Sequence, residues 1–243
     1  MSVIYKKNYL DNVIFRVDFD ALYKINDPPS EFQEKVKEKF PIPEQKELRE
    51  YTWDFIKKEQ TDKIYPLWIF YNLDKSQKIN ISYKFFSLEF TKYHSFPEFK
   101  LIIEETYNNF IKIYNPPLIT RFGLRYINKI VLNNGNPFDW SSYINSSLTH
   151  PIDNFFEDKK NLSRAITQVS MNCGDYNILF SYGFYNSEYP NRISRKEFVL
   201  DYDCSSGNIE PTNVIGNLET YNSIINDLFE RSIDSKLKEE MNK

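Results

Sequence analysis

Two arginines near the middle of the chain are spaced so that both would lie on one face of a β-strand. The segment RFGLRYINKI covers residues 121–130, and side chains alternate between the two faces of a strand. Arg121, Gly123 and Arg125 therefore share a face, and Gly123 would let a ligand approach the backbone between the two guanidinium groups. The pattern predicts a small positive site for an anionic ligand or for a protein partner.

The acidic residues of the chain offer a second interpretation of the same arginines. Asp18, Asp201 and Asp203 lie in predicted strands, and arginines on a sheet face often pair with neighbouring carboxylates. The sequence leaves structural pairing and ligand binding both open. Asn128 lies on the opposite, apolar face, where its amide must find a hydrogen bond, and a loop is the expected partner.

A related position in the first half of the chain extends the predicted site. The triplet at 15–17, Phe-Arg-Val, occupies the place that Leu-Arg-Tyr at 124–126 occupies in the second half, so its arginine would add a third cation. The predicted ligand- or partner-binding residues are Arg121, Gly123, Arg125, Arg16 and Asn128.

Other residues with chemical potential lack the surroundings that catalysis needs. Asp201 and Asp203 would share a strand face and could hold magnesium with a third acidic group, but no nuclease motif accompanies them. His94 precedes a helix cap and His150 precedes a proline, so both are expected in surface loops, with no nucleophile motif beside them. We therefore predict no catalytic residue, no metal and no cofactor.

Composition narrows the class of protein. The 243 residues are 41% hydrophobic with 20 Phe and 18 Tyr, enough to bury a core, whereas 6 Gly argue against glycine-rich phosphate loops. A net charge of −3 argues against a chain-wide nucleic-acid footprint. Cys173 and Cys204 are far apart and outside any CxxC unit. Without an apolar leader or a membrane-length apolar run, a cytoplasmic protein with reduced thiols is expected.

The elements that would position these residues form a similar series in each half. The first half predicts a strand at 12–19, a helix at 31–39 with Ser30 and Gln33 as a capping box, and a helix from Ser95 to Asn115. Between the two helices lie strand-like runs at about 50–57, 67–72, 78–83 and 85–91.

The second half begins with a long strand at 118–132. It continues with a turn at 133–137, a short helix at 138–144, an irregular stretch at 145–161, strands at 162–171, 176–185 and 196–203 with a tight turn at 173–175, and a helix from 214 to about 241. The agreement of order predicts an α+β fold of two similar β-α-β(3-4)-α lobes, 1–116 and 117–243, packed as one unit. In each lobe, a long amphipathic helix would cover an antiparallel sheet, as in TATA-binding-protein-like or helix-grip-like folds.

The central motif carries a resemblance to a known family. RFGLRYINKI, the preceding YHSFPEFKLIIEETYNNFIKIYNPP and the late Leu-Asp-Tyr-Asp at 200–203 are similar to a sporadically distributed, uncharacterised prokaryotic family with an R-x-G-L-R-Y-x-N core motif. That family brings no activity or cofactor to transfer. Its patchy distribution implies a bacterial setting with mobile genes, such as defence or toxin–antitoxin loci.

These observations favour a non-enzymatic binding or interaction subunit of a bacterial assembly, with antiviral defence as its setting. It would engage a protein partner or a small anionic ligand through the arginine-bearing sheet face, with no membrane contact. One alternative is a metal-dependent nuclease or nucleotide-processing enzyme that uses Asp201 and Asp203. Another is a nucleic-acid-binding protein that stacks bases on Phe180, Tyr182 and Phe184, although this row is expected to be core.

Overall fold

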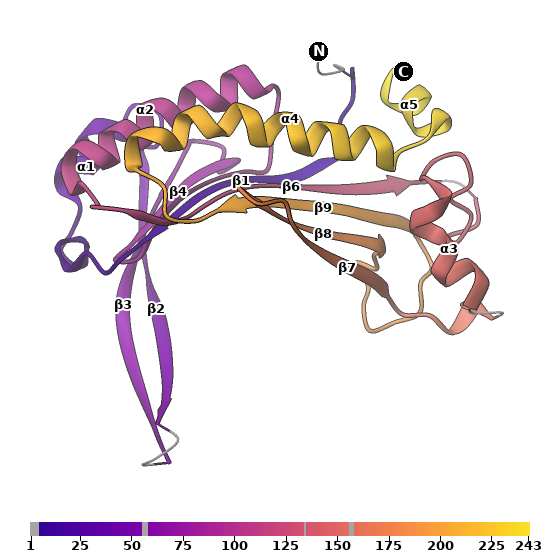
Figure 1. Cartoon of the computed structure of the whole chain (residues 1–243), viewed down its shortest axis with the longest axis horizontal. Coiled ribbons are helices and arrows are strands. Elements are labelled where there is room, and N and C mark those ends of the chain that lie inside the picture. The colour runs from indigo at the N-terminus through magenta and orange to yellow at the C-terminus, as the bar shows by residue number, and fades with distance from the viewer. Residues whose placement is uncertain (1–4, 55–57, 134, 156–157) are drawn as a thin grey trace. The chain divides into compact units, whose positions relative to one another are not determined.

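The computed structural model describes residues 5–54, 58–133, 135–155 and 158–243, and within them nine strands form one sheet (Figure 1). The strand order is β2-β3-β4-β5-β1-β6-β9-β8-β7. The strands are β1 Leu10–Phe19, β2 Ile42–Asp54, β3 Glu59–Tyr71, β4 Gln77–Ser82, β5 Phe85–Phe90, β6 Ile119–Leu132, β7 Ala165–Asn172, β8 Asn177–Phe184 and β9 Lys196–Ser206. The predicted α+β class with an antiparallel sheet is confirmed.

In the described residues the α-helices are fewer than the strands, and two of them are 19 residues long. The α-helices are α1 Ser30–Val36, α2 Phe96–Tyr114, α3 Ser146–Phe155, α4 Val214–Ser232 and α5 Ser235–Met241, and 3-10 turns occupy Tyr23–Asn26, Lys159–Asn161 and Pro211–Asn213. No helix in the described part of the chain has the length and apolar character needed to cross a membrane.

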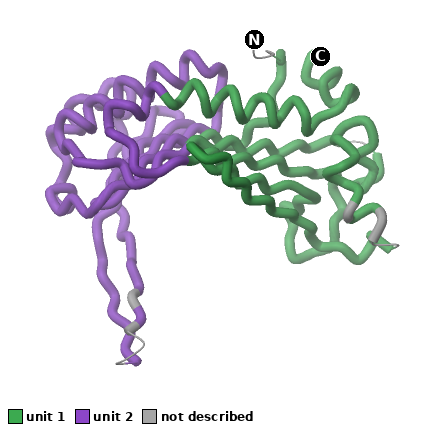
Figure 2. Tube along the Cα trace, viewed as in Figure 1, with its two compact units in different colours: residues 1–13, 124–205, 217–243 green, residues 14–123, 206–216 purple. Residues whose placement is uncertain are grey.

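The chain divides into two compact units whose segments alternate along the sequence (Figure 2). One unit comprises residues 1–13, 124–205 and 217–243, and the other comprises residues 14–123 and 206–216. We refer to them as unit 1 and unit 2. The repeat of one plan in residues 1–116 and 117–243 stays a prediction.

The core of unit 2 lies between its strands and helix α2. Phe15 of β1 is fully buried and contacts Tyr107 of α2, with ring centroids 5.7 Å apart. Phe86 of β5 and Phe110 of α2 lie 4.7 Å apart in the same way. The predicted cap of this helix is confirmed, because the Glu98 N–H donates to the Ser95 hydroxyl oxygen.

Unit 1 is built on the same principle, with helix α4 against the aromatic faces of β8 and β9. Phe180, Tyr182 and Tyr202 are buried, and the rings of Phe180 and Tyr202 stack with centroids 4.6 Å apart. The Tyr126 hydroxyl of β6 donates to the Asn222 side chain of α4 at 2.8 Å. The aromatic row of β8 is therefore core, as expected, and cannot stack nucleic-acid bases.

Helix α1 differs from the prediction at both ends. Pro29 occupies the N-cap position, Ser30 is already the first helical residue, and Gln33 uses its backbone N–H to bond the Pro29 carbonyl. The predicted capping box is therefore wrong, and no side chain caps this helix. The helix also ends at Val36 rather than at residue 39. Beyond Val36, backbone N–H groups donate to the Val36 carbonyl in single turns, in place of the regular α-helical hydrogen bonds.

The segment after β6 was predicted least well. Residues 138–144 form turns rather than a helix, because Asp139 accepts bonds from Ser141 and the Trp140 indole donates to the Pro137 carbonyl. Helix α3 lies in the stretch that was predicted to be irregular, and the Asn145 side chain accepts the Ser147 N–H at its start.

The C-terminal helix is also interrupted, which the sequence did not predict. It ends at Ser232, because Ile233 leaves the helix to form a bridge with Ile144. Helix α5 then starts after Asp234, whose side chain accepts from the Ser235 N–H. A tertiary contact therefore divides a segment that is helical by local pattern alone.

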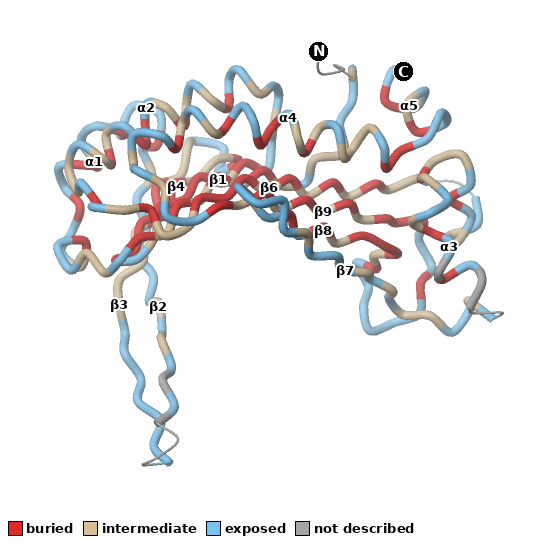
Figure 3. Tube along the Cα trace, viewed as in Figure 1, coloured by how far each residue is buried: buried red, intermediate tan, exposed pale blue. Residues whose placement is uncertain are grey.

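Strands β2 and β3 form a hairpin much longer than the predicted runs at 50–57 and 67–72. Their register continues from the pair Ile42–Tyr71 to the pair Asp54–Glu59, whereas β3 pairs with β4 only over residues 68–71. We call residues 46–54 and 59–67, which lie beyond the register with β4, the arm. Its backbone projects from unit 2 and is largely exposed (Figures 1 and 3).

Candidate functional site

Two of the predicted arginines, both in unit 2, converge on one carboxylate on the polar face of the strands. Arg16 of β1 donates to Asp18 through Nε at 2.8 Å and Nη2 at 2.7 Å, and its guanidinium lies 4.2 Å from the Phe85 ring centroid. Arg121 of β6 places Nη1 3.9 Å from the second oxygen of Asp18. These side chains are only partly exposed, so the predicted cations are present on this face but already contact a carboxylate.

Gly123 has a different role from the one the sequence suggested. A Cβ atom at this position would lie 2.7 Å from Nη1 and 2.9 Å from Nη2 of Arg121. The space above Gly123 is therefore filled by the guanidinium of its own strand. The glycine accommodates Arg121, and a ligand would have to displace that side chain to approach the backbone.

Arg125, the predicted arginine that lies in unit 1, makes the most complete ion pair of the predicted set. Arg125 donates to both oxygens of Asp201 on β9, through Nε at 2.8 Å and Nη2 at 2.6 Å. The pKa of Arg125 is raised, chiefly by this hydrogen bond, and burial opposes the shift. The Asp201 side chain is 14% exposed and that of Arg125 is 42% exposed, so one partner is largely desolvated and the other is not.

Asn128 also serves the strand architecture. Its side chain is buried, and Nδ2 donates to the Leu200 carbonyl of β9 at 3.3 Å. The expected partner was a loop, and the observed partner is a neighbouring strand. In unit 1, Arg125 and Asn128 therefore both join β6 to β9, one from each face of the sheet.

The residues considered for alternative chemistry are Asp201, Asp203 and the two histidines. In the ranges that the structure describes, no three His, Cys, Asp or Glu side chains gather where a metal ion could bind. Asp201 is engaged by Arg125, which competes with a cation for the same oxygens. His150 lies in helix α3 and not in a loop, while His94 lies in the predicted loop before α2.

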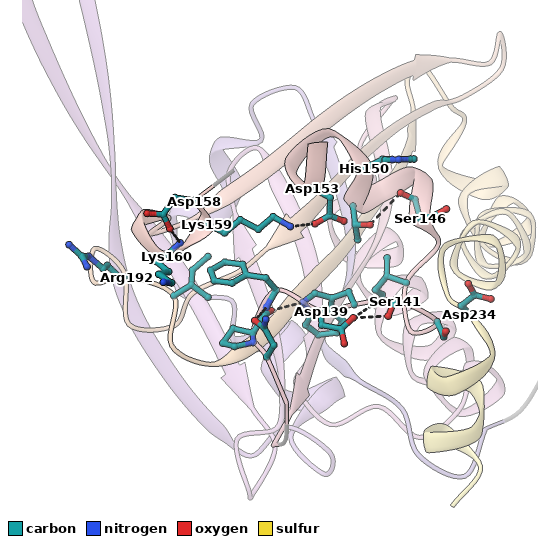
Figure 4. Close-up of a pocket in the computed structure, with 18 residues that line it drawn as sticks. Asp139, Ser141, Ser146, His150, Asp153, Asp158, Lys159, Lys160, Arg192 and Asp234 are labelled. Carbon is teal, nitrogen blue, oxygen red and sulfur yellow. Dashed lines mark hydrogen bonds and ion pairs between the residues drawn. The ribbon is translucent and has the colours of Figure 1, made fainter. Parts of the chain in front are cut away.

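A cleft of about 1000 Å³ in unit 1 was not predicted, because it is lined by the misassigned stretch after β6 (Figure 4). Among its charged groups, Lys159 pairs with Asp153, and Asp139 accepts a hydrogen bond from the Ser141 hydroxyl. Lys196 lies against Trp140 and Tyr143 nearby, and burial lowers the pKa of its amine. The remaining lining is a mixture of polar and apolar side chains without a common charge.

The arm presents the clearest cluster of exposed apolar side chains in unit 2. Tyr51 is 61% exposed, Trp53 is 50% exposed and Ile64 is 56% exposed. Tyr51 and Trp53 are two residues apart on β2, and Ile64 is opposite Arg49, so all three lie on one face of the hairpin. We call these three residues the aromatic face of the arm. The sequence signal was the i, i+2 spacing of two aromatic residues within a charged run.

The base of the arm is anchored to neighbouring side chains of unit 2. Tyr65 stacks on Tyr83 with ring centroids 3.8 Å apart, and Lys84 pairs with Glu50 at 3.1 Å. These contacts hold the face opposite Tyr51 and Trp53. The aromatic face is therefore directed away from the anchoring contacts and towards solvent.

Comparison with protein-family models finds no family that matches this chain. A comparison with curated proteins finds no similar sequence either.

Proposed function

We propose that the protein is a non-enzymatic interaction subunit that binds a protein partner through the arm. The single observation that carries this proposal is the exposed aromatic face formed by Tyr51, Trp53 and Ile64. Tyr and Trp are the residue types that most often dominate the energy of protein interfaces. Scattered exposed apolar residues need no explanation, but three on one face of a projecting hairpin do.

The energetics of the arm support the same conclusion. A two-stranded hairpin with solvent on both faces is marginally stable, because it buries little apolar surface. A partner that covered the aromatic face would contribute roughly 1.5–3 kcal/mol for each large apolar side chain that becomes fully buried.

The arginine-bearing faces favour a protein partner over a small anionic ligand. A small anion would have to displace Asp201 from Arg125, or Asp18 from Arg16, and would leave a partly desolvated carboxylate beside it. A protein surface can instead add hydrogen bonds at the exposed edge of each ion pair. In the proposal, Arg16 and Arg121 in unit 2, and separately Arg125 in unit 1, add secondary contacts, with Gly123 and Asn128 holding strand β6.

The wider setting is part of the proposal and rests on the resemblance of RFGLRYINKI to a prokaryotic family. It places the protein in a bacterial assembly, with antiviral defence as the context. The proposal also retains two similar lobes, each an antiparallel sheet under a long helix, in a TATA-binding-protein-like or helix-grip-like arrangement. The supporting observation is that α2 and α4 each cover strands of one unit.

Affinity capture tests the proposed function. The tagged full chain, the double variant Tyr51→Ala with Trp53→Ala, and the control Leu73→Ala with Leu101→Ala would be incubated with extract of the source organism. Leu73 and Leu101 are also highly exposed but lie outside the arm. We expect quantitative mass spectrometry to find proteins retained by the wild type and control and lost by the arm variant. Equal retention by all three chains would contradict the proposal.

A further inference from the structure

Strand β2 of the arm is the edge strand of the sheet. The direction in which each of its backbone N–H and carbonyl groups points follows from the register. The Asn72 N–H donates to the Gln77 carbonyl, so even-numbered residues of β3 direct their backbone groups towards β4 and odd-numbered residues towards β2. Because Tyr71 pairs with Ile42, the even-numbered residues of β2 bond β3. The odd-numbered residues of β2 direct their N–H and carbonyl groups outward.

The two prolines of the hairpin agree with this assignment. Pro43 is an odd-numbered residue of β2 and Pro66 is an even-numbered residue of β3, so each lacks its N–H on the side away from the partner strand. Pro66 interrupts the outer edge of β3 within the arm. The outer edge of β2 keeps its donors at Gln45, Glu47, Arg49 and the positions beyond, and it is therefore the edge suited to accept another strand.

The charges of this edge are arranged symmetrically about Leu48. Residues 46–50 read Lys-Glu-Leu-Arg-Glu, so each charged residue has an oppositely charged residue at the same distance on the other side of Leu48. A strand with this property is complementary to its own antiparallel copy. With a two-fold axis at Leu48, Glu47 would lie opposite Arg49 of the second copy, and Lys46 opposite Glu50 of the second copy.

Neighbouring registers fail on the same criterion. When two β2 strands pair antiparallel, the residues whose backbone groups point outward must lie opposite each other. An odd-numbered residue of one copy then pairs with an odd-numbered residue of the other, so the two-fold axis passes through a residue and not between two residues. An axis at Lys46, Glu47, Arg49 or Glu50 would place that charged residue against its own copy, which is unfavourable. Leu48 is the one uncharged residue of the run. The pattern therefore selects a single register among those that overlap extensively.

We propose that two copies of the chain associate by antiparallel pairing of their β2 strands about Leu48. The inference rests on the proposed function and adds a second copy of this chain at the β2 edge of the same arm, beside the face that binds the partner protein. The two hairpins form a four-stranded sheet, and Trp53 of each copy lies opposite the exposed Pro43 of the other. The aromatic faces of the two arms join into one larger surface for the partner protein.

Charge reversal tests the register with the full-length chain. Glu47→Arg alone places like charges opposite one another twice in each dimer, and so does Arg49→Glu alone. Because the contact is small, dissociation in roughly the micromolar range is expected for the wild type. Sedimentation velocity should show a rise in Kd of about tenfold or more for each single variant. An equimolar mixture of the two variants restores opposite charges across the axis and should regain the wild-type Kd.

The controls separate this inference from the proposed function. Asp62→Arg reverses a charge on the same face of the arm but on β3, and it should dimerise like the wild type. A monomeric wild type, a dimer that ignores both single variants, or a mixture that does not recover would overturn the self-pairing. If the wild type is monomeric and capture still depends on Tyr51 and Trp53, only the self-pairing is wrong. If it dimerises as described and capture ignores those residues, only the partner-binding function is wrong.

Discussion

The ion pair between Arg125 and Asp201 makes a quantitative prediction about the role of the arginine-bearing face in unit 1. A buried pair costs about 3–5 kcal/mol to break, and an exposed pair contributes about 0.2–1 kcal/mol. This pair has two short hydrogen bonds, one partner at 14% exposure and the other at 42%. We therefore expect a coupling free energy of roughly 1–2 kcal/mol, between these limits.

The two single variants should not be equivalent. Arg125→Ala leaves the Asp201 carboxylate largely desolvated and without its cation. Asp201→Ala leaves a guanidinium that water can still reach. We expect Arg125→Ala to lower the free energy of unfolding by about 2 kcal/mol and Asp201→Ala by about 1 kcal/mol at neutral pH.

Urea unfolding of the wild type, both single variants and the double variant measures these quantities as a double-mutant cycle. A coupling energy within about 0.3 kcal/mol of zero would refute the structural interpretation of the pair. So would a larger cost for Asp201→Ala than for Arg125→Ala. Either result would indicate that Arg125 is available to bind an anionic ligand.

Three further predictions concern individual residues. Gly183 has φ +147, and a Cβ there would lie 2.1 Å from the Ala165 carbonyl oxygen, so Gly183→Ala should lower the unfolding free energy by about 3 kcal/mol or more. Gly216 lies in open space on α4, so Gly216→Ala should raise the unfolding free energy by up to about 1 kcal/mol in the same denaturation assay. Burial raises the pKa of Cys204 to about 12, so a thiol reagent at pH 8 should label only the exposed Cys173 until the chain is unfolded; two fast thiols would contradict the fold. Burial lowers the pKa of Lys196, so its charged form is disfavoured in the folded state, and Lys196→Met should be neutral or stabilising at pH 7. The difference in unfolding free energy between the variant and the wild type should shrink as pH rises through the lowered pKa towards about 10.4. A difference that grows with pH would refute this sign.

Much of the fold was predictable where one face of an element is buried. Alternation at residues 12–19 and 121–130 predicted β1 and β6, because Phe15 and Phe122 are fully buried whereas Arg16 and Arg121 beside them are partly exposed. The cap at Ser95 and the turn at 173–175 were also predicted correctly, since both depend on residues adjacent in sequence. These features need only local patterns and a sheet with one covered face.

The arm was predicted poorly because neither of its faces is buried. Strand β2 carries charged residues on both sides from Glu44 to Glu50, so the two-residue alternation that marks a half-buried strand is absent. Helix α3 and the break at Ile233 failed for other reasons. Pro151 obscured the helix, and the contact between Ile233 and Ile144 joins residues far apart in sequence.

The arginine site was predicted in its members but not in its partners. The shared strand face of Arg121 and Arg125 followed from spacing alone. The pairing of Arg125 with Asp201 depends on β9 lying beside β6, which no local pattern reveals. Gly123 was assigned to a ligand because the reach of the Arg121 side chain over its own strand is invisible in the sequence.

Residue-resolved hydrogen exchange of the β2 backbone tests the central claim most directly. The N–H groups of Glu47, Arg49 and Tyr51 point outward from the arm, and another strand would bond them. The account predicts that these amides exchange more slowly as the protein concentration rises, while exchange of the control amides on β5 does not change. Rapid, concentration-independent exchange of all three outward amides, in the purified chain and in the extract-bound complex alike, would contradict it.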